Sequence, residues 1–171
     1  MTKIILPKTY IEYNKQIDNP LIFLAGPIRH APDWQEEAIK YLFSKNKNII
    51  IANPRWNASK YISSLAIDGR TDFFTRQRAW EKHYLNIAFQ NGCVLFWLEN
   101  APGLMTRVEL GQSMAHYQHD KNTKFCVGGD KKFLDIETIR YDLLTDTGKN
   151  IFSTLEETCN NALEMTEKPH L

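Results

Sequence analysis

Residues 21–27 read LIFLAGP, a continuous apolar run that ends at a glycine and a proline. An unbroken apolar run of this length is typical of a parallel strand that is covered on both faces. A helix should open soon after it, because Asp33 can cap a segment in which Trp34, Ala38 and Leu42 share one side. A buried strand followed by an amphipathic helix predicts the first unit of an α/β fold.

The alternation of strand and helix continues along the chain. Further strands are expected at 49–52, 93–98, 123–127 and 151–152. Helices are expected at 73–89, 105–117 and 135–144, and a last one begins at Ser153, in a capping box with Glu156. The polar stretch 57–72 is long for a connection, which makes it a candidate lid over a binding site. The pattern predicts an α/β fold with about five mostly parallel strands and helices on both faces.

The composition is that of one ordinary globular domain, with 171 residues, 43% of them hydrophobic and 24% charged. There are 21 basic and 20 acidic residues, whereas a protein that binds nucleic-acid phosphates normally shows a basic excess. The longest apolar run, 93–98, is far shorter than a membrane span, and the N-terminal run is too short for a signal-peptide core. We therefore expect a cytoplasmic protein without nucleic-acid or membrane partners.

The cysteines and histidines give no sign of a metal site. Cys93, Cys126 and Cys159 are evenly spaced, but their sequence contexts differ, so we reject a repeat. Their odd number and the lack of a CxxC pair argue against disulfides and zinc, and Cys93 and Cys126 should be core residues. His116 and His119 have no third ligand nearby, so we interpret them as surface residues. With GxGxxG, P-loop and HExxH motifs also missing, we expect no cofactor and no metal.

In a parallel sheet, ligands bind beyond the carboxyl ends of the strands, so functional residues are sought there. The residues that follow the first two strands form one candidate set: Gly26, Pro27, Ile28, Arg29, Asn53 and Arg55. A structural turn is an equally good interpretation of each of these segments. Gly128 and Gly129, after the fourth strand, match no P-loop spacing and are interpreted as a plain glycine turn.

Glu109 is the candidate for chemistry. Its helix is expected to begin near Thr106, so Glu109 would lie in or near the first turn, where the helix dipole stabilises a carboxylate. The alternative is that Glu109 only completes a capping box with Thr106. Glu81, in the preceding helix, is by default part of a solvated face, whereas Trp80 and Tyr84 should face the core. Two carboxylates that converge on one crevice are what glycosyl transfer requires.

Taken in order, these segments resemble the nucleoside 2-deoxyribosyltransferase-like family. The blocks that carry the likeness are IFLAGPI at 22–28, APDWQ at 31–35, ANPR at 52–55, the segments 77–85 and 91–98, and TRVELG at 106–111. The likeness covers about Leu21 to Leu163 and so describes a single domain. It implies a flavodoxin-like three-layer fold and a retaining attack on the N-glycosidic bond of a (2-deoxy)nucleoside or nucleoside monophosphate.

The resemblance also implies roles for single residues. Glu109 would be the nucleophile that forms a covalent (deoxy)ribosyl-enzyme, and Glu81 would be the second acidic residue, which contacts the base or helps to protonate it. Gly26, Pro27 and Ile28 match the loop that lines the ribose pocket, and Arg29 is similar to an arginine that binds phosphate in relatives acting on monophosphates. The remaining residues of the expected binding set are Asn53, Arg55 and Trp80. A homo-oligomer is implied, because family members commonly complete the site from a neighbouring subunit.

The chain also departs from the family pattern. Gly92 stands where relatives often have an acidic residue, Gln112 and Ser113 replace the last two residues of an ELGEW block, and 101–105 lacks the acidic residue that transferases carry before the nucleophile. Hydrolysis and base transfer therefore both stay open. The alternative from another class is a nucleotide-binding sensor without catalysis, in which Glu109 is merely a cap. A flavin-binding protein of the same architecture is a third interpretation.

Overall fold

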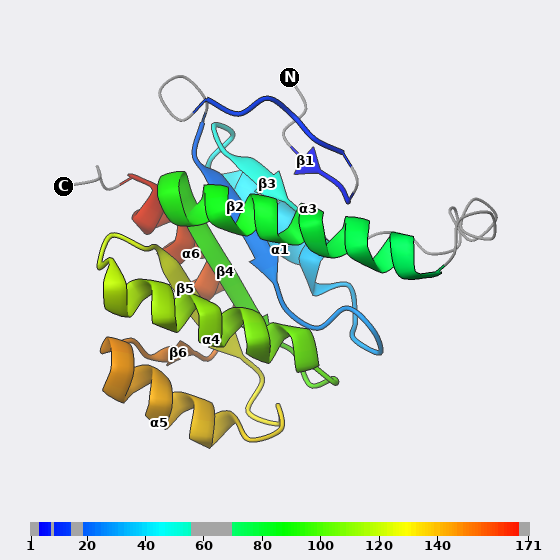
Figure 1. The fold of residues 1–171 in the computed structure, drawn as a ribbon. Coiled ribbons are helices and arrows are strands. Elements are labelled where there is room, and N and C mark those ends of the chain that lie inside the picture. Colours follow the sequence, from blue (N-terminus) through cyan, green and yellow to red (C-terminus); the bar gives the residue numbers. More distant parts are fainter. Residues whose placement is uncertain (1–3, 8, 15–18, 56–69, 168–171) are drawn as a thin grey trace.

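Six parallel strands form one sheet in the computed structural model, which describes residues 4–7, 9–14, 19–55 and 70–167 (Figure 1). The strands are β1 (Ile4–Ile5), β2 (Leu21–Ala25), β3 (Ile50–Ala52), β4 (Gly92–Leu98), β5 (Phe125–Gly129) and β6 (Ile151–Phe152). The helices described with them are α1 (Trp34–Lys45), α3 (Arg70–Asn91), α4 (Leu104–His119), α5 (Ile136–Thr147) and α6 (Leu155–Glu167). None of these helices is both long enough and apolar enough to span a membrane.

The strand order is β1-β3-β2-β4-β5-β6, and every neighbouring pair runs parallel. Apart from the short edge strand β1, this is the flavodoxin-like order, in which the first strand lies between the second and the third. The order reverses between β2 and β4, where Ala25 is paired with Phe96. The predicted fold class is confirmed, and the chain direction places this reversal at the sheet edge where such folds bind ligands.

Helices cover both faces of the sheet, with α3, α4 and α5 on one side and α1 and α6 on the other (Figure 1). Alternate residues of β2 face opposite layers. Phe23 packs with Trp80 of α3, and Leu24 belongs to the cluster that contains Trp34 of α1. Because both faces are covered, the strand is apolar at every position, as the sequence predicts. Cys93 and Cys126 are buried, which confirms them as core residues.

The glycine pair at 128–129 corrects one prediction. Gly128 and Gly129 are the last two residues of β5 rather than a turn. A Cβ atom on Gly128 would collide with Oγ1 of Thr158 on α6, so the missing side chain lets the helix lie close to the strand. Helix packing, and not a turn or a phosphate loop, explains this glycine.

Many helix and strand ends shift by one to three residues from the prediction, and three differences are informative. β1 was not predicted, because no strand–helix alternation marks the N-terminal segment that holds it, whereas β6, equally short, directly precedes a capped helix. α3 begins at Arg70, three residues before the predicted start, and the rest of the candidate lid, 57–69, lies outside the described residues. The capping box of α6 is formed by Thr154 and Glu157, each donating its backbone N–H to the other's side chain, instead of by Ser153 and Glu156.

Candidate active site

Glu109 lies in the second turn of α4, the helix that follows β4 at the point of strand reversal. The helix begins at Leu104, with Gly103 as an N-cap that makes no side-chain hydrogen bond. Thr106 is therefore inside the helix, and the alternative interpretation, in which Glu109 only completes a capping box with Thr106, is wrong. The helix dipole acts mainly within the first turn, so it stabilises the Glu109 carboxylate less than expected.

Burial dominates the electrostatics of Glu109, whose residue surface is only 7% exposed. Desolvation raises the pKa of its carboxyl to about 7, against the lowering effect of a hydrogen bond from Arg78, while the charge of Glu81 adds to the rise. A carboxyl with this pKa exists in both protonation states near neutral pH. Perturbed carboxyls of this kind cluster at catalytic sites.

Arg78 of α3 joins the two candidate carboxylates. Its Nη1 donates to Oε1 of Glu109 at 2.7 Å, and the same nitrogen contacts Oε2 of Glu81. The side chains of Glu81 and Glu109 are 13% and 8% exposed, so both carboxylates are largely shielded from water. Because the two oxygens share one nitrogen, they lie no farther apart than roughly the 5 Å that separates the carboxyl groups of retaining glycosidases.

Glu81 has both of its oxygens occupied. Oε2 accepts from Arg78, and Oε1 accepts from Nε2 of Gln77 at 2.9 Å. The expected default, a solvated helix face, does not hold for Glu81, because its side chain turns toward α4 through Arg78.

The loop after β2 comes close to the start of α4. A Cβ on Gly26 would lie 2.5 Å from Cζ2 of Trp34 and closer still to the carbonyl oxygen of Trp97, so only glycine fits there. The carbonyl of Pro27 accepts a hydrogen bond from Nε1 of Trp34 at 2.9 Å, and Pro27 also packs next to Gly103. The predicted sugar-binding loop therefore borders the N-terminal end of the helix that carries Glu109.

Arg55 holds this loop from the end of β3. Its Nη2 donates to the carbonyl of Pro32 at 2.8 Å and to those of Ile28 and Ala31 at 3.3 Å, while Nε donates to Gln35 at 2.7 Å. The Arg55 side chain, expected to bind substrate, is thus committed to groups of the protein itself, including an ion pair of Nε with Asp33 at 3.2 Å. Within the described residues, the guanidinium acts as a brace for 28–35.

The remaining expected binding residues fall into separate environments. Arg29 is exposed on the braced loop, next to His30, whose φ of 60° lies in the left-handed region. Asn53 is nearly buried and accepts the backbone N–H of Arg55 at 3.0 Å, so it shapes the turn after β3. Trp80 is fully buried and donates from Nε1 to the carbonyl of Thr9 at 2.9 Å, which places it in the core and away from the carboxylate pair.

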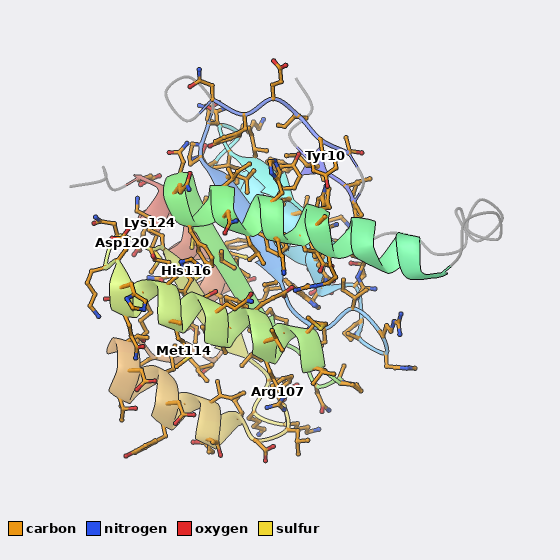
Figure 2. All side chains as sticks on the ribbon, viewed as in Figure 1. Tyr10, Arg107, Met114, His116, Asp120 and Lys124 are labelled. Atoms are coloured by element: carbon orange, nitrogen blue, oxygen red, sulfur yellow. The ribbon has the colours of Figure 1, made fainter. Side chains whose placement is uncertain are left out.

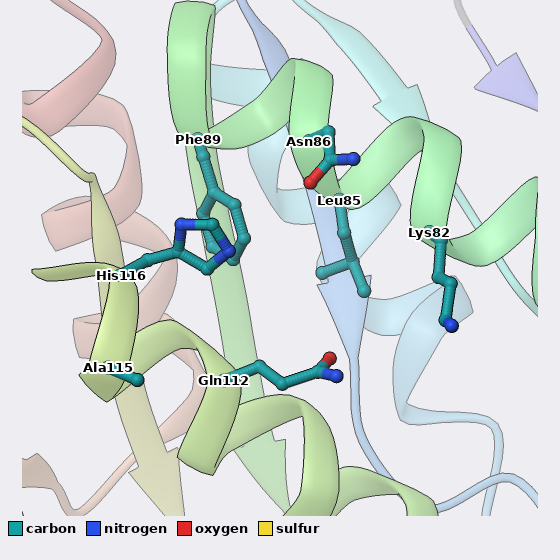
Figure 3. A pocket seen from close by; sticks show the side chains of 7 residues that line it. All are labelled: Lys82, Leu85, Asn86, Phe89, Gln112, Ala115 and His116. Carbon is teal, nitrogen blue, oxygen red and sulfur yellow. The ribbon is translucent and has the colours of Figure 1, made fainter.

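A groove of about 320 Å³ continues the seam between α3 and α4 (Figure 3). It is lined by Lys82, Leu85, Asn86, Phe89, Gln112, Ala115 and His116. The lining begins one residue beyond Glu81 on α3 and three beyond Glu109 on α4. Both helices run away from the carboxyl edge of the sheet, so the groove leads away from the two carboxylates along the same seam.

A second groove, of about 490 Å³, lies on the other side of α4, against α5. Arg107 and Met114, both labelled in Figure 2, line it from α4. Asp135 and Asp142 line it from the α5 side. In the described part of the chain, no three His, Cys, Asp or Glu side chains gather in a way that could hold a metal. His116 and His119 are exposed, and the His116 ring packs against Phe89.

Comparison with models of protein families and with curated proteins finds no match to this chain. The family resemblance therefore stays a prediction, and the candidate site stands on its geometry. The sequence reasoning missed Arg78 and Gln77. A signal was available, because a cation three residues before Glu81 lies on the same side of a helix, but the sequence does not show that this side meets Glu109.

Proposed function

We propose that this protein cleaves or transfers at the N-glycosidic bond of a (2-deoxy)nucleoside or nucleoside monophosphate, through a covalent glycosyl-enzyme on Glu109. The observation that carries the proposal is the pair of shielded carboxylates, Glu109 and Glu81, on one nitrogen of Arg78. Retaining glycosyl chemistry uses two carboxyl groups roughly 5 Å apart, and the shared nitrogen keeps an oxygen of each carboxylate within about that distance of the other. The site also borders the strand reversal, where sheets of this topology bind ligands.

In the proposed reaction, a carboxylate oxygen of Glu109 attacks the anomeric carbon. The bond from that carbon to the base nitrogen breaks, its electron pair stays with the nitrogen, and the base leaves as it takes up a proton from solvent. Water or a second base then attacks the same carbon, gives up a proton to solvent and releases the sugar, which restores the carboxylate of Glu109. Two inversions retain the configuration, and the second nucleophile decides between hydrolysis and transfer.

The other site residues divide the remaining tasks. We assign Glu81 the contact with the departing base, and Gly26, Pro27 and Ile28 the wall of the sugar pocket. Arg29 is exposed on the loop that Arg55 braces, and its guanidinium, which forms no ion pair with another described residue, suits a 5′-phosphate. Arg55 then serves substrate binding indirectly, through the shape of that loop.

The sensor alternative loses one of its supports. It explained Glu109 as a helix cap, but the cap of α4 is Gly103, and Glu109 is buried against α3. A buried carboxylate without a capping role costs folding free energy, which is easier to understand if it has a chemical task.

The test is long incubation with ribo- and deoxyribonucleosides and their monophosphates, with and without an added acceptor base. Free base indicates hydrolysis, and an exchanged base indicates transfer. Glu109→Gln should abolish either product, while Glu137→Gln, a change at an exposed acid of α5, should not. Confirmed nucleotide binding without any product from the wild type would contradict the proposal and favour the sensor.

A further inference from the structure

We propose that Arg78 is a positioning residue for Glu109, which holds one carboxylate oxygen in place, keeps the group charged and leaves the other oxygen to attack the sugar. This inference rests on the proposed function and adds a residue to it. Neither the sequence patterns nor the family resemblance assigns a role to Arg78.

The two carboxylate oxygens of Glu109 have different surroundings. Nη1 of Arg78 donates to Oε1 at 2.7 Å, and the contact crosses from α3 to α4, between positions 31 apart in sequence. Among the described residues, Oε2 of Glu109 accepts no hydrogen bond. A carboxylate held at one oxygen has its plane fixed, so the other oxygen is presented in a defined direction. Oε2 is therefore the attacking atom.

Arg78 is itself held from its own helix. Glu81, three residues further along α3, contacts the same Nη1 through Oε2, and its Oε1 accepts from Gln77. Side chains at these spacings lie on one side of a helix. Glu81 therefore keeps the guanidinium turned toward α4, in addition to any contact with the base. Ordering the arginine before substrate arrives avoids an entropic cost in the reaction.

The charge of Glu109 depends on this arrangement. Burial favours the protonated form, which is not a nucleophile, and Arg78 is the group that opposes it. The charged groups that act on Glu109 among the described residues are Arg78, which lowers its pKa, and Glu81, which raises it. Arg107, on the same helix as Glu109, contacts the carbonyl of Leu134 instead, on the α5 side. Loss of the Arg78 charge should therefore raise the pKa of Glu109 further.

The experiment is a direct titration of Glu109 by NMR in protein labelled with ¹³C at the glutamate carboxyls. The Glu109 signal is identified by its loss in Glu109→Gln. Arg78→Met keeps the bulk of the side chain and removes the charge, so the pKa of Glu109 should rise by about 1 to 3 units. Arg78→Lys should restore part of the shift, and Arg140→Met, at an exposed ion pair of α5, should cause none. An unchanged or lowered pKa in Arg78→Met would overturn the proposal.

A second readout separates this inference from the proposed function. In the wild type, base release should fall away as the pH drops through the pKa of Glu109, and in Arg78→Met the same limb of kcat/KM should move to higher pH. Base release that depends on Glu109, with an unshifted titration in Arg78→Met, would overturn the Arg78 proposal alone. A shifted titration in a protein that releases no base would support the hold of Arg78 on Glu109 and overturn the proposed function.

Discussion

Arg78 and Glu109 meet across two helices, with 2.7 Å between Nη1 and Oε1. The same guanidinium nitrogen also contacts Glu81, so a single cation serves two carboxylates that are mostly shielded from water. The charge state of Glu109 is consequently a property of the tertiary structure and not of its own helix. A substitution at Arg78 should therefore change both the contact between α3 and α4 and the reactivity of Glu109.

Glu109→Gln should change how stability depends on pH. Burial raises the pKa of Glu109 from 4.5 to about 7, so the folded protein holds the proton more tightly than the unfolded chain does. The stabilising contribution of this proton to the free energy of unfolding is therefore fully present below pH 4.5. It is lost as the pH rises from 4.5 to about 7, and above that pH it changes no further. Relative to the wild type, Glu109→Gln should gain free energy of unfolding across this window, of the order of 3 kcal/mol in total. Urea denaturation at several pH values measures the difference, and a pH-independent difference would count against the buried carboxyl.

Gly26→Ala should destabilise the protein, because the added Cβ would lie 2.5 Å from Cζ2 of the Trp34 ring. Overpacking of this kind costs about 1 to 3 kcal/mol. The matched control is Gly111→Ala, where nothing lies within 4 Å of the added atom, and replacing glycine inside a helix should stabilise by about 0.5 to 1 kcal/mol. Urea denaturation should show a lower free energy of unfolding for Gly26→Ala and a higher one for Gly111→Ala. Equal changes in the two variants would refute the close packing at Gly26.

Arg55→Met should loosen the loop at 28–35 without disturbing the sheet. The substitution removes the hydrogen-bond donors to three backbone carbonyls and to Gln35. The same loop carries Arg29, the residue expected to bind phosphate. A misplaced loop would weaken the contact between Arg29 and the phosphate, and a charged hydrogen bond of this kind is worth about 1.5 to 3 kcal/mol. We therefore expect KM for a monophosphate to rise at least tenfold, with kcat less affected. Arg140→Met is the control, and an unchanged KM in Arg55→Met would show that the brace is not needed.

Thr154→Ala should cost about 1 kcal/mol of unfolding free energy, because it removes the side chain that caps α6. Ser153→Ala should change it by less than about 0.5 kcal/mol, since no capping bond of Ser153 is found. Thermal unfolding of the two variants compares them directly. The reverse ranking would place the cap at Ser153 after all.

The sheet was predictable because its strands are buried on both faces. The runs at 21–25 and 93–98 are apolar at every position, and such runs are difficult to place anywhere except in the centre of a parallel sheet. The start of α6 was less certain, since Ser153 with Glu156 and Thr154 with Glu157 both fit the capping-box spacing. Local sequence does not distinguish the two, and the structure shows the hydrogen bonds between Thr154 and Glu157.

The candidate site was predictable only in part. Glu109 follows from its place after a central strand, which is a consequence of topology. Its partner Arg78 is a tertiary contact, and the local sequence of α3 does not indicate which side of it meets α4. Arg55 shows the reverse ambiguity, since a cation at a strand end looks like a ligand-binding group whether it binds substrate or the carbonyls of a neighbouring loop, and the structure shows its contacts to the loop. For Trp80 the two lines of reasoning differ. Its helical spacing with Tyr84 predicts a core position, which the structure shows, whereas the family resemblance places it in the binding set.

The most direct test of a covalent glycosyl-enzyme on Glu109 is the mass of the intact protein after rapid acid quenching of its reaction with a nucleoside that it cleaves. We predict a fraction of the protein heavier by one (deoxy)ribosyl group, with the addition mapped to the peptide that contains Glu109 and missing in Glu109→Gln. Release of base by Glu109→Gln at the wild-type rate, or an adduct on another residue, would contradict it.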